Sequence, residues 1–145
     1  NDGMNDMRYK EGAGFTVTSS GAHTLKYSQE GLKSPVLLNT MPLIRLPEMY
    51  YILAECTDDL EESAALISTV REARGIEDVS FANETEKMNN IEKEYRKEFY
   101  AEGQLWYFYK RLGYETFLYC PVDKMVEANY RFAIPDDETI LGNIN

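Results

Sequence analysis

The sequence predicts a mostly α-helical fold, in which a short helical hairpin precedes one long helix, with irregular loops and a small β-hairpin beside them. Two observations carry this prediction. Apolar residues recur at helical spacing in three separate stretches of the chain, and Pro and Gly residues stand between those stretches. We expect a single domain over residues 1–145, with a loop and hairpin segment at 1–40, a helical core at 41–112 and an aromatic loop and tail at 113–145.

The first forty residues mix Gly, Ser and Thr with two short β-prone pieces, GFTVTSS and SPVLLN. A polar stretch around Gly21 to Gly31 separates the two pieces. Short runs of this kind, bounded by turn residues, are typical of strands joined by loops. The segment therefore predicts a long loop that contains one hairpin.

Two short helices are predicted next. Pro42 and Pro47 precede the first, which we expect to run from about Pro47 to Thr57, because proline is tolerated only in the first helical turn. An apolar stripe from Leu60 to Arg74 marks the second, and Gly75 follows it where a left-handed cap is expected. Together they form an antiparallel hairpin of the size of one tetratricopeptide-like unit.

The long third helix is predicted from IEKEYRKEFYAEGQLWYFYKR at 91–111, with Gly113 closing it. Its stripe at spacings of three and four is apolar or aromatic except for Glu102 and Gly103. A carboxylate facing a core requires a basic partner, since an unpaired buried charge costs several kcal/mol. A glycine within a helix indicates a close neighbouring backbone. The pair therefore predicts a tight helix crossing.

An acidic row on this helix needs basic partners from elsewhere in the chain. Glu94, Glu98 and Glu102 stand at i, i+4 and i+8, which is unfavourable in an isolated helix. Arginine pairs well with carboxylates, because its planar fork can donate two parallel hydrogen bonds. We expect a structural salt-bridge network with partners drawn from Arg45, Arg71 and Arg74.

Four strings, read in order, resemble the C-terminal part of the SusD/RagB family. They are MPLIRLPEMYYILAE, AALISTVREARG, EYRKEFYAEGQLWYFYKR and YRFAIPDDET. Members of that family are glycan-capturing outer-membrane lipoproteins of Bacteroidetes-type bacteria. They are much longer, so we expect this chain to be a C-terminal fragment or a strongly truncated relative. The chain departs from the family pattern at Leu105 and Phe108, where a basic residue and an aspartate are usual.

The resemblance implies a SusD-like fold and a non-catalytic role in glycan capture for nutrient uptake. The partners that it implies are an oligosaccharide or polysaccharide, bound by the full-length protein, and a SusC-like TonB-dependent transporter. It also implies a lipid anchor in the outer membrane, facing outward, through an N-terminal cysteine that this chain lacks. From the residue patterns alone, a helical-hairpin scaffold that binds protein partners without glycan affinity remains an alternative.

Aromatic residues gather in the irregular segment after the long helix. We name Tyr114, Phe117, Tyr119 and Tyr130 as candidate ligand-binding residues, because the apolar face of a sugar stacks on exposed rings. The alternative is that these rings are packed against the core. Which alternative holds for each ring depends on its exposure.

Composition and motifs exclude several function classes. A formal charge of −10, from 15 basic and 25 acidic residues, argues against nucleic-acid binding. We expect no catalytic residues, metal or cofactor: no phosphate loop or metal spacing is visible, and His23 lies in a polar loop without a nucleophile motif. A hydrolase is less well supported, because arginines are available to pair with the carboxylates of the acidic row.

The two cysteines are far apart in the sequence. We expect Cys56 to be buried and both Cys56 and Cys120 to be unpaired thiols, with a disulfide between them as the alternative.

Overall fold

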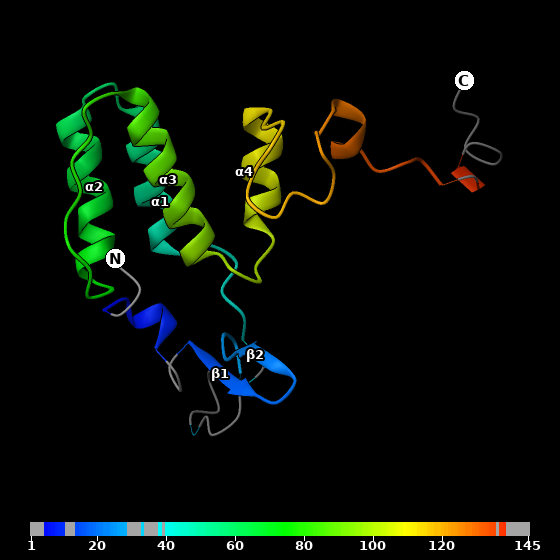
Figure 1. Cartoon of the computed structure of the whole chain (residues 1–145), viewed down its shortest axis with the longest axis horizontal. Coiled ribbons are helices and arrows are strands. Elements are labelled where there is room, and N and C mark those ends of the chain that lie inside the picture. Colours follow the sequence, from blue (N-terminus) through cyan, green and yellow to red (C-terminus); the bar gives the residue numbers. More distant parts are fainter. Residues whose placement is uncertain are drawn as a thin grey trace. The chain divides into compact units, whose positions relative to one another are not determined.

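The computed structural model describes residues 5–10, 14–28, 33, 38, 40–135 and 137–138. Within them the fold is mostly helical with one two-stranded hairpin, which confirms the predicted fold class (Figure 1). The chain divides into two compact units, Asn1–Gly103 and Gln104–Asn145, and the single domain over residues 1–145 stays a prediction. Among the described residues no helix has the length and apolar character needed to cross a membrane.

The β-hairpin of the first unit pairs β1 (Phe15–Thr18) with β2 (Gly21–Thr24) in antiparallel register. A single 3-10 turn, η2 (Met7–Tyr9), precedes it. The second strand is thus GAHT, which lies within the stretch whose polar residues predict a loop. The other β-prone piece, SPVLLN, falls mostly on residues 34–37 and 39, which lie outside the described residues.

The predicted helical hairpin is formed by α1 (Leu46–Cys56) and α2 (Leu60–Glu72). Pro47 stands in the first turn of α1, and the Asp59 side chain accepts hydrogen bonds from the first turn of α2. Ser63 Oγ joins the two helices by donating to the Ala54 carbonyl at 2.8 Å. Gly75 closes the pair with φ +78, a left-handed conformation that favours glycine.

The sequence predicted one continuous helix over residues 91–111, and this prediction is wrong because the helix is interrupted. The structure has α3 (Glu84–Glu98) and α4 (Gln104–Leu112), separated by a turn in which Ala101 and Gly103 have φ values of 62° and 87°. The Glu98 carbonyl accepts hydrogen bonds from Arg45 and Lys26 instead of from the helix. These cations therefore take the place of the backbone donor that would have continued α3.

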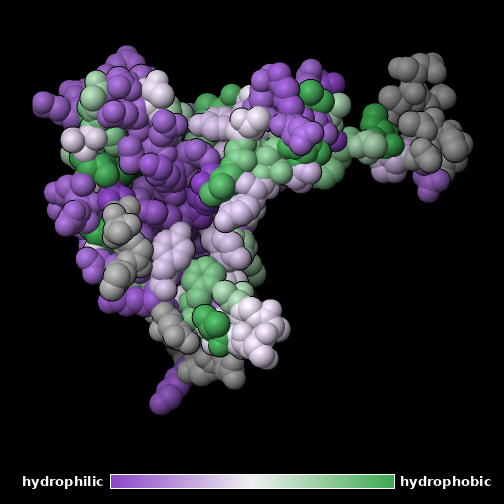
Figure 2. Space-filling view, in the orientation of Figure 1, coloured by the Kyte–Doolittle hydropathy of each residue, from purple (hydrophilic) through white to green (hydrophobic). Residues whose placement is uncertain are grey.

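The core of the first unit lies between α1, α2 and α3, where Tyr51, Ile67 and Ile91 are fully buried. Tyr51, Tyr95 and Phe99 form a cluster of rings with centroids 5.1–6.0 Å apart. Figure 2 shows hydrophilic side chains covering α2 and α3 on the face in view. The α2 and α3 helices are therefore amphipathic, with their apolar sides in the bundle.

The second unit is built on α4 and the short η3 (Glu127–Tyr130). The chain turns back after Gly113, and the Met125 N–H donates to the Glu115 carbonyl at 2.7 Å. Phe108, Tyr109, Met125 and Tyr130 are its buried apolar residues. Cys120 in this unit and Cys56 in the first are free thiols, and Cys56 is exposed, which corrects its expected burial.

Candidate functional site

Two groups of side chains were candidates, and the first is the ion cluster around the acidic row. Glu94 lies on α3 with 1% of its side chain exposed, and its carboxylate accepts from Arg71 at 2.7 Å and from Arg8 at 2.9 Å. Lys97, one turn further on, contacts the same carboxylate at 3.0 Å. Arg71 also donates to the Glu77 carbonyl, so its fork is fixed from two sides.

Glu98 and Glu102 complete the row. Arg74 holds Glu98 in a two-point contact of 3.1 and 2.8 Å, and Arg45 holds Glu102 in another of 3.1 and 2.7 Å. Arg45 also reaches Glu98 at 2.5 Å and so bridges the two acids. The Glu102 side chain is 5% exposed, so the predicted contact between Glu102 and Arg45 is present and shielded.

The electrostatics of this cluster are those of fixed ion pairs. Burial alone would raise the pKa of Glu98, but hydrogen bonds from Arg74 and Arg45 outweigh it and hold that pKa at about 2. Arg8 likewise keeps the pKa of Asp6 below its usual value, against the effect of burial. A general acid needs a pKa near the working pH, so Glu98 is unsuited to donate a proton to a leaving group.

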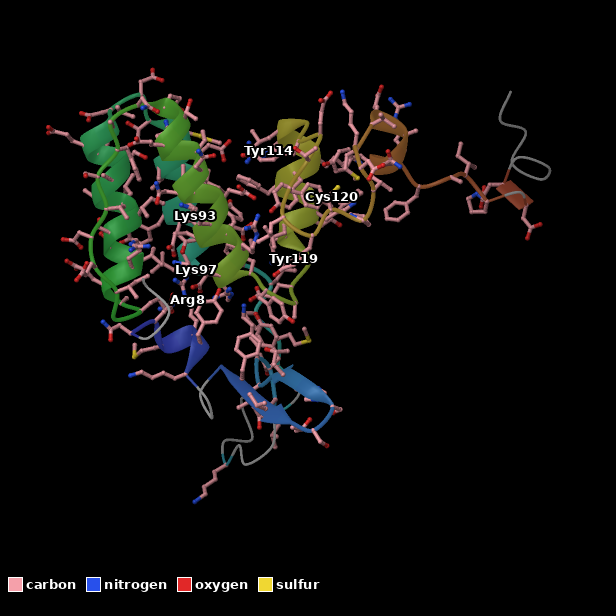
Figure 3. The ribbon with its side chains drawn as sticks, in the orientation of Figure 1. Arg8, Lys93, Lys97, Tyr114, Tyr119 and Cys120 are labelled. Carbon is pink, nitrogen blue, oxygen red and sulfur yellow. The ribbon has the colours of Figure 1, made fainter. Side chains whose placement is uncertain are left out.

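Sequence reasoning missed four members of the cluster, namely Asp6, Arg8, Lys26 and Lys97. Asp6 is fully buried and pairs with Arg8 through contacts of 2.9 and 2.7 Å. Arg8 therefore lies between Asp6 and the acids of α3 (Figure 3). For Asp6, Arg8 and Lys26 the available signal was charged residues within NDMRY and LKY, segments without helical periodicity. Lys97, by contrast, stands at i+3 from Glu94 on the predicted helix.

Gly103 does not mark the predicted helix crossing. A Cβ atom placed there would meet no other atom of the described residues within 4 Å, so no second backbone among them passes close to it. Its φ of 87° is the reason for glycine at this position, because the turn after α3 needs a left-handed residue there. That expectation of close packing is therefore wrong.

The second group comprises the four candidate rings, and the structure separates them. Tyr130 is 6% exposed, and its hydroxyl donates to the Tyr114 carbonyl at 2.6 Å. Phe117 is half-buried and stacks on Tyr109 with centroids 4.1 Å apart, and Tyr114 packs against the same ring at 5.2 Å. These three rings are occupied chiefly in packing the second unit.

Tyr119 differs from the other three rings. Its side chain is 89% exposed, and its φ of 63° is unusual for a residue that is not glycine. It stands in a turn closed by a 3.0 Å hydrogen bond from the Cys120 N–H to the Phe117 carbonyl. Figure 3 draws Tyr114 at the C-terminal end of α4 and Tyr119 toward its other end. An unfavourable backbone conformation thus presents an aromatic ring to solvent.

Sequence reasoning also missed an exposed ring in the tail. Phe132 is 86% exposed and lies 5.6 Å from Trp106, with the two ring planes inclined by 30°. Lys110 Nζ lies 4.8 Å from the centre of the Trp106 ring. Phe132 was within the segment identified as aromatic, but no periodicity distinguishes an exposed ring from a buried one in irregular chain.

Among the described residues no group of His, Cys, Asp and Glu is arranged to hold a metal ion. Comparison with protein-family models matches residues 4–139 to the SusD family. Searches of curated proteins and of solved structures give no match.

Proposed function

Because the chain belongs to the SusD family, we propose that it acts without catalysis in the capture of a glycan for nutrient uptake at the outer membrane. The family match over residues 4–139 is the observation that carries the proposal. The two units then have different tasks. The first is a scaffold, and the second supplies rings to a sugar.

The ion cluster supports the scaffold role of the first unit. Glycoside hydrolysis uses two carboxyl groups, one of which must hold a proton at working pH. Glu94, Glu98 and Glu102 are instead paired with arginines, and the Glu98 pKa of about 2 keeps that residue ionised. Removal of either partner would leave a buried charge unpaired, so these residues serve stability.

Tyr119 and Phe132 support the binding role of the second unit. A sugar stacks its C–H face on an exposed ring, and both rings are almost fully exposed. The other candidate rings predicted from the sequence contribute by holding the loops in place, namely Tyr114, Phe117 and Tyr130. Of these, Tyr114 and Phe117 are half-buried, so their edges remain accessible at the margin of the surface.

The test is calorimetry of the full-length protein with a panel of neutral oligosaccharides. At least one member of the panel should bind saturably, and Tyr119→Ala and Phe132→Ala should each weaken binding by about fivefold or more, as loss of a stacking ring predicts. Tyr100→Ala, which removes a half-exposed ring of the first unit, is the matched control and should leave affinity unchanged. Binding that survives both ring variants would refute the assignment of the surface.

The finer features of the proposal are the lipid anchor and a SusC-like TonB-dependent transporter as partner. Both rest on family membership. Co-purification from membranes of the source organism, with the protein tagged at its C-terminus, would test them together. Recovery of a TonB-dependent transporter in a fixed ratio would support the partnership, and its absence from the purified material would contradict it.

A second candidate function is a scaffold for protein partners. An exposed apolar row on α1 favours it, since Leu46 and Leu53 are more than half exposed and Met49 lies between them on the same helix face. Residues just before the helix, Leu43 and Ile44, extend this row. A scaffold of this kind would give no heat with any oligosaccharide, whereas the glycan-binding protein would.

A further inference from the structure

A pocket of about 570 Å³ opens in the second unit beside η3. Its floor includes the buried ring of Tyr130, and charged side chains surround it. Those charged residues are Lys110, Lys124, Arg131, Glu115 and Glu127. Figure 2 shows hydrophilic and hydrophobic residues side by side over this unit.

The lining has a charge opposite to that of the whole chain. Three cations and two carboxylates give it a net charge of +1, in a chain whose formal charge is −10. A basic pocket on an acidic protein has a positive local electrostatic potential, which favours anions over neutral or cationic ligands. This excess of cations therefore indicates what charge the pocket accepts.

Each of the three cations lies beside a partner and still has donors to offer. Lys124 pairs with Glu115 at 2.8 Å, and Arg131 donates to Glu127 through one nitrogen of a guanidinium that carries five N–H groups. Lys110 lies over the Trp106 ring. Flexible side chains that are already oriented lose less entropy when a ligand binds.

A ring platform adjoins the pocket. Glu127 and Arg131 also line a smaller hollow of about 350 Å³ that includes the exposed ring of Phe132. Trp106 connects the two, because Lys110 lies 4.8 Å from its ring centre and Phe132 lies 5.6 Å from it. Cationic donors and a stacking ring therefore stand within reach of one saccharide.

We infer that the second unit binds an anionic saccharide, with a carboxylate or sulfate group held by Lys110, Lys124 and Arg131 and a sugar face resting on Phe132. This inference rests on the proposed glycan-capture function and names the ligand class of that same surface. Arginine suits the role because its fork donates two parallel hydrogen bonds to such anions.

The experiment is calorimetry of the full-length protein with four probes in two pairs. The first pair is a galacturonic acid tetrasaccharide and its methyl-esterified form, which is neutral. The second pair is a sulfated heparin tetrasaccharide and its desulfated form, which keeps its carboxylates and so carries less charge. At least one probe should bind about tenfold more tightly than the less charged member of its pair. Whether the uronate or the sulfate pair shows the difference identifies the anionic group. Added salt should weaken the preference, because exposed charges are screened.

Variants locate the anion. Lys110→Gln and Arg131→Gln should each reduce the preference for the anionic probe about threefold to tenfold, and Arg131→Lys should restore part of it. Lys93→Gln is the control, because Lys93 is an exposed lysine on α3 in the other unit (Figure 3). Circular dichroism of each variant checks the fold, and all three positions are exposed on the surface.

The contradicting outcomes are distinct. Equal binding of the two members of each pair, lost in Phe132→Ala, would overturn the inference and leave glycan capture standing. A preference for the anion that Lys110→Gln and Arg131→Gln leave unchanged would overturn the site. No binding of any probe or of the neutral panel would overturn both the inference and the proposed function.

Discussion

The ion cluster of the first unit and the aromatic surface of the second differ in how far along the chain their contacts reach. Arg8, Arg45 and Arg74 come from three separate segments to meet the acids of α3. The rings of the second unit are all drawn from 106–132. The first region therefore fixes a tertiary arrangement, whereas the second is local.

This difference indicates in which unit residues can be substituted at little cost in stability. Each carboxylate of the cluster is buried and has a charged partner, so substitution there leaves an uncompensated charge. Tyr119 and Phe132 contribute little buried surface and can change with little loss of stability. Ligand specificity is thus expected to vary on the second unit without disturbing the first.

The largest predicted effect is that of Glu98→Ala. It would leave Arg45 and Arg74 without a shared acceptor, at a cost of about 3 to 5 kcal/mol in the free energy of unfolding. Glu127→Ala removes an exposed ion pair with Arg131 at i, i+4 and should cost about 0.5 kcal/mol. Urea unfolding of both variants measures the contrast, and equal costs would break the distinction between cluster and surface.

Acidification should weaken the first unit. The Glu98 pKa is held at about 2, below its ordinary 4.5, so the folded state binds fewer protons than the unfolded chain. The resulting stability is fully present above pH 4.5 and is lost as pH falls from 4.5 toward 2, by about 3 kcal/mol in all. Urea midpoints measured between pH 6 and 2.5 would show the decline. Glu98→Gln should flatten it, and an equally steep decline in that variant would contradict the assignment to Glu98.

Gly103 distinguishes backbone conformation from packing at the end of the first unit. Gly103→Ala should cost about 1 kcal/mol, because φ of 87° disfavours any residue with a Cβ atom. Gly103→Leu should cost about the same, since a Cβ atom at this position meets no other atom within 4 Å. Thermal melting of the two variants decides between backbone conformation and close packing as the reason for glycine. A much larger loss of melting temperature for the leucine variant would support the helix crossing that the sequence predicted.

The smallest predicted effect on stability belongs to Tyr119→Gly. Glycine relieves the left-handed strain at this turn but increases the freedom of the unfolded chain, so the two changes nearly cancel, to within about 0.5 kcal/mol. Saccharide affinity should nevertheless fall, because the exposed ring is gone. A variant that melts as the parent does but binds less would sharpen the comparison, whereas one that unfolds easily would assign Tyr119 a packing role.

The sequence predicts the helical elements and the arginine partners well, because both follow from periodicity. Glu102 on an apolar stripe demands a cation, and Arg45 is the cation within an apolar helix start. The break between α3 and α4 escapes prediction, because Trp106 continues the stripe beyond Gly103. The α3 helix ends where the chain enters a left-handed turn and the Glu98 carbonyl accepts from Arg45 and Lys26, and the positions of these two cations depend on tertiary structure.

The binding surface could be predicted only in part. Aromatic composition identifies the segment, but exposure depends on contacts that the sequence does not reveal. Tyr130 is buried because its hydroxyl finds the Tyr114 carbonyl, and Phe117 is occupied by stacking on Tyr109. Arg8 and Asp6 lie in a segment without a repeating pattern, so no sequence signal joined them to α3.

Hydrogen–deuterium exchange of the full-length protein, with and without a bound oligosaccharide from the panel, tests the division of tasks most directly. If the first unit is a scaffold and the second binds the ligand, amide exchange should become slower on ligand binding in residues 113–133, which carry Tyr119 and Phe132. Exchange in the acidic row at 94–102 should stay unchanged. Ligand-dependent protection confined to residues 94–102, with none in 113–133, would contradict the account.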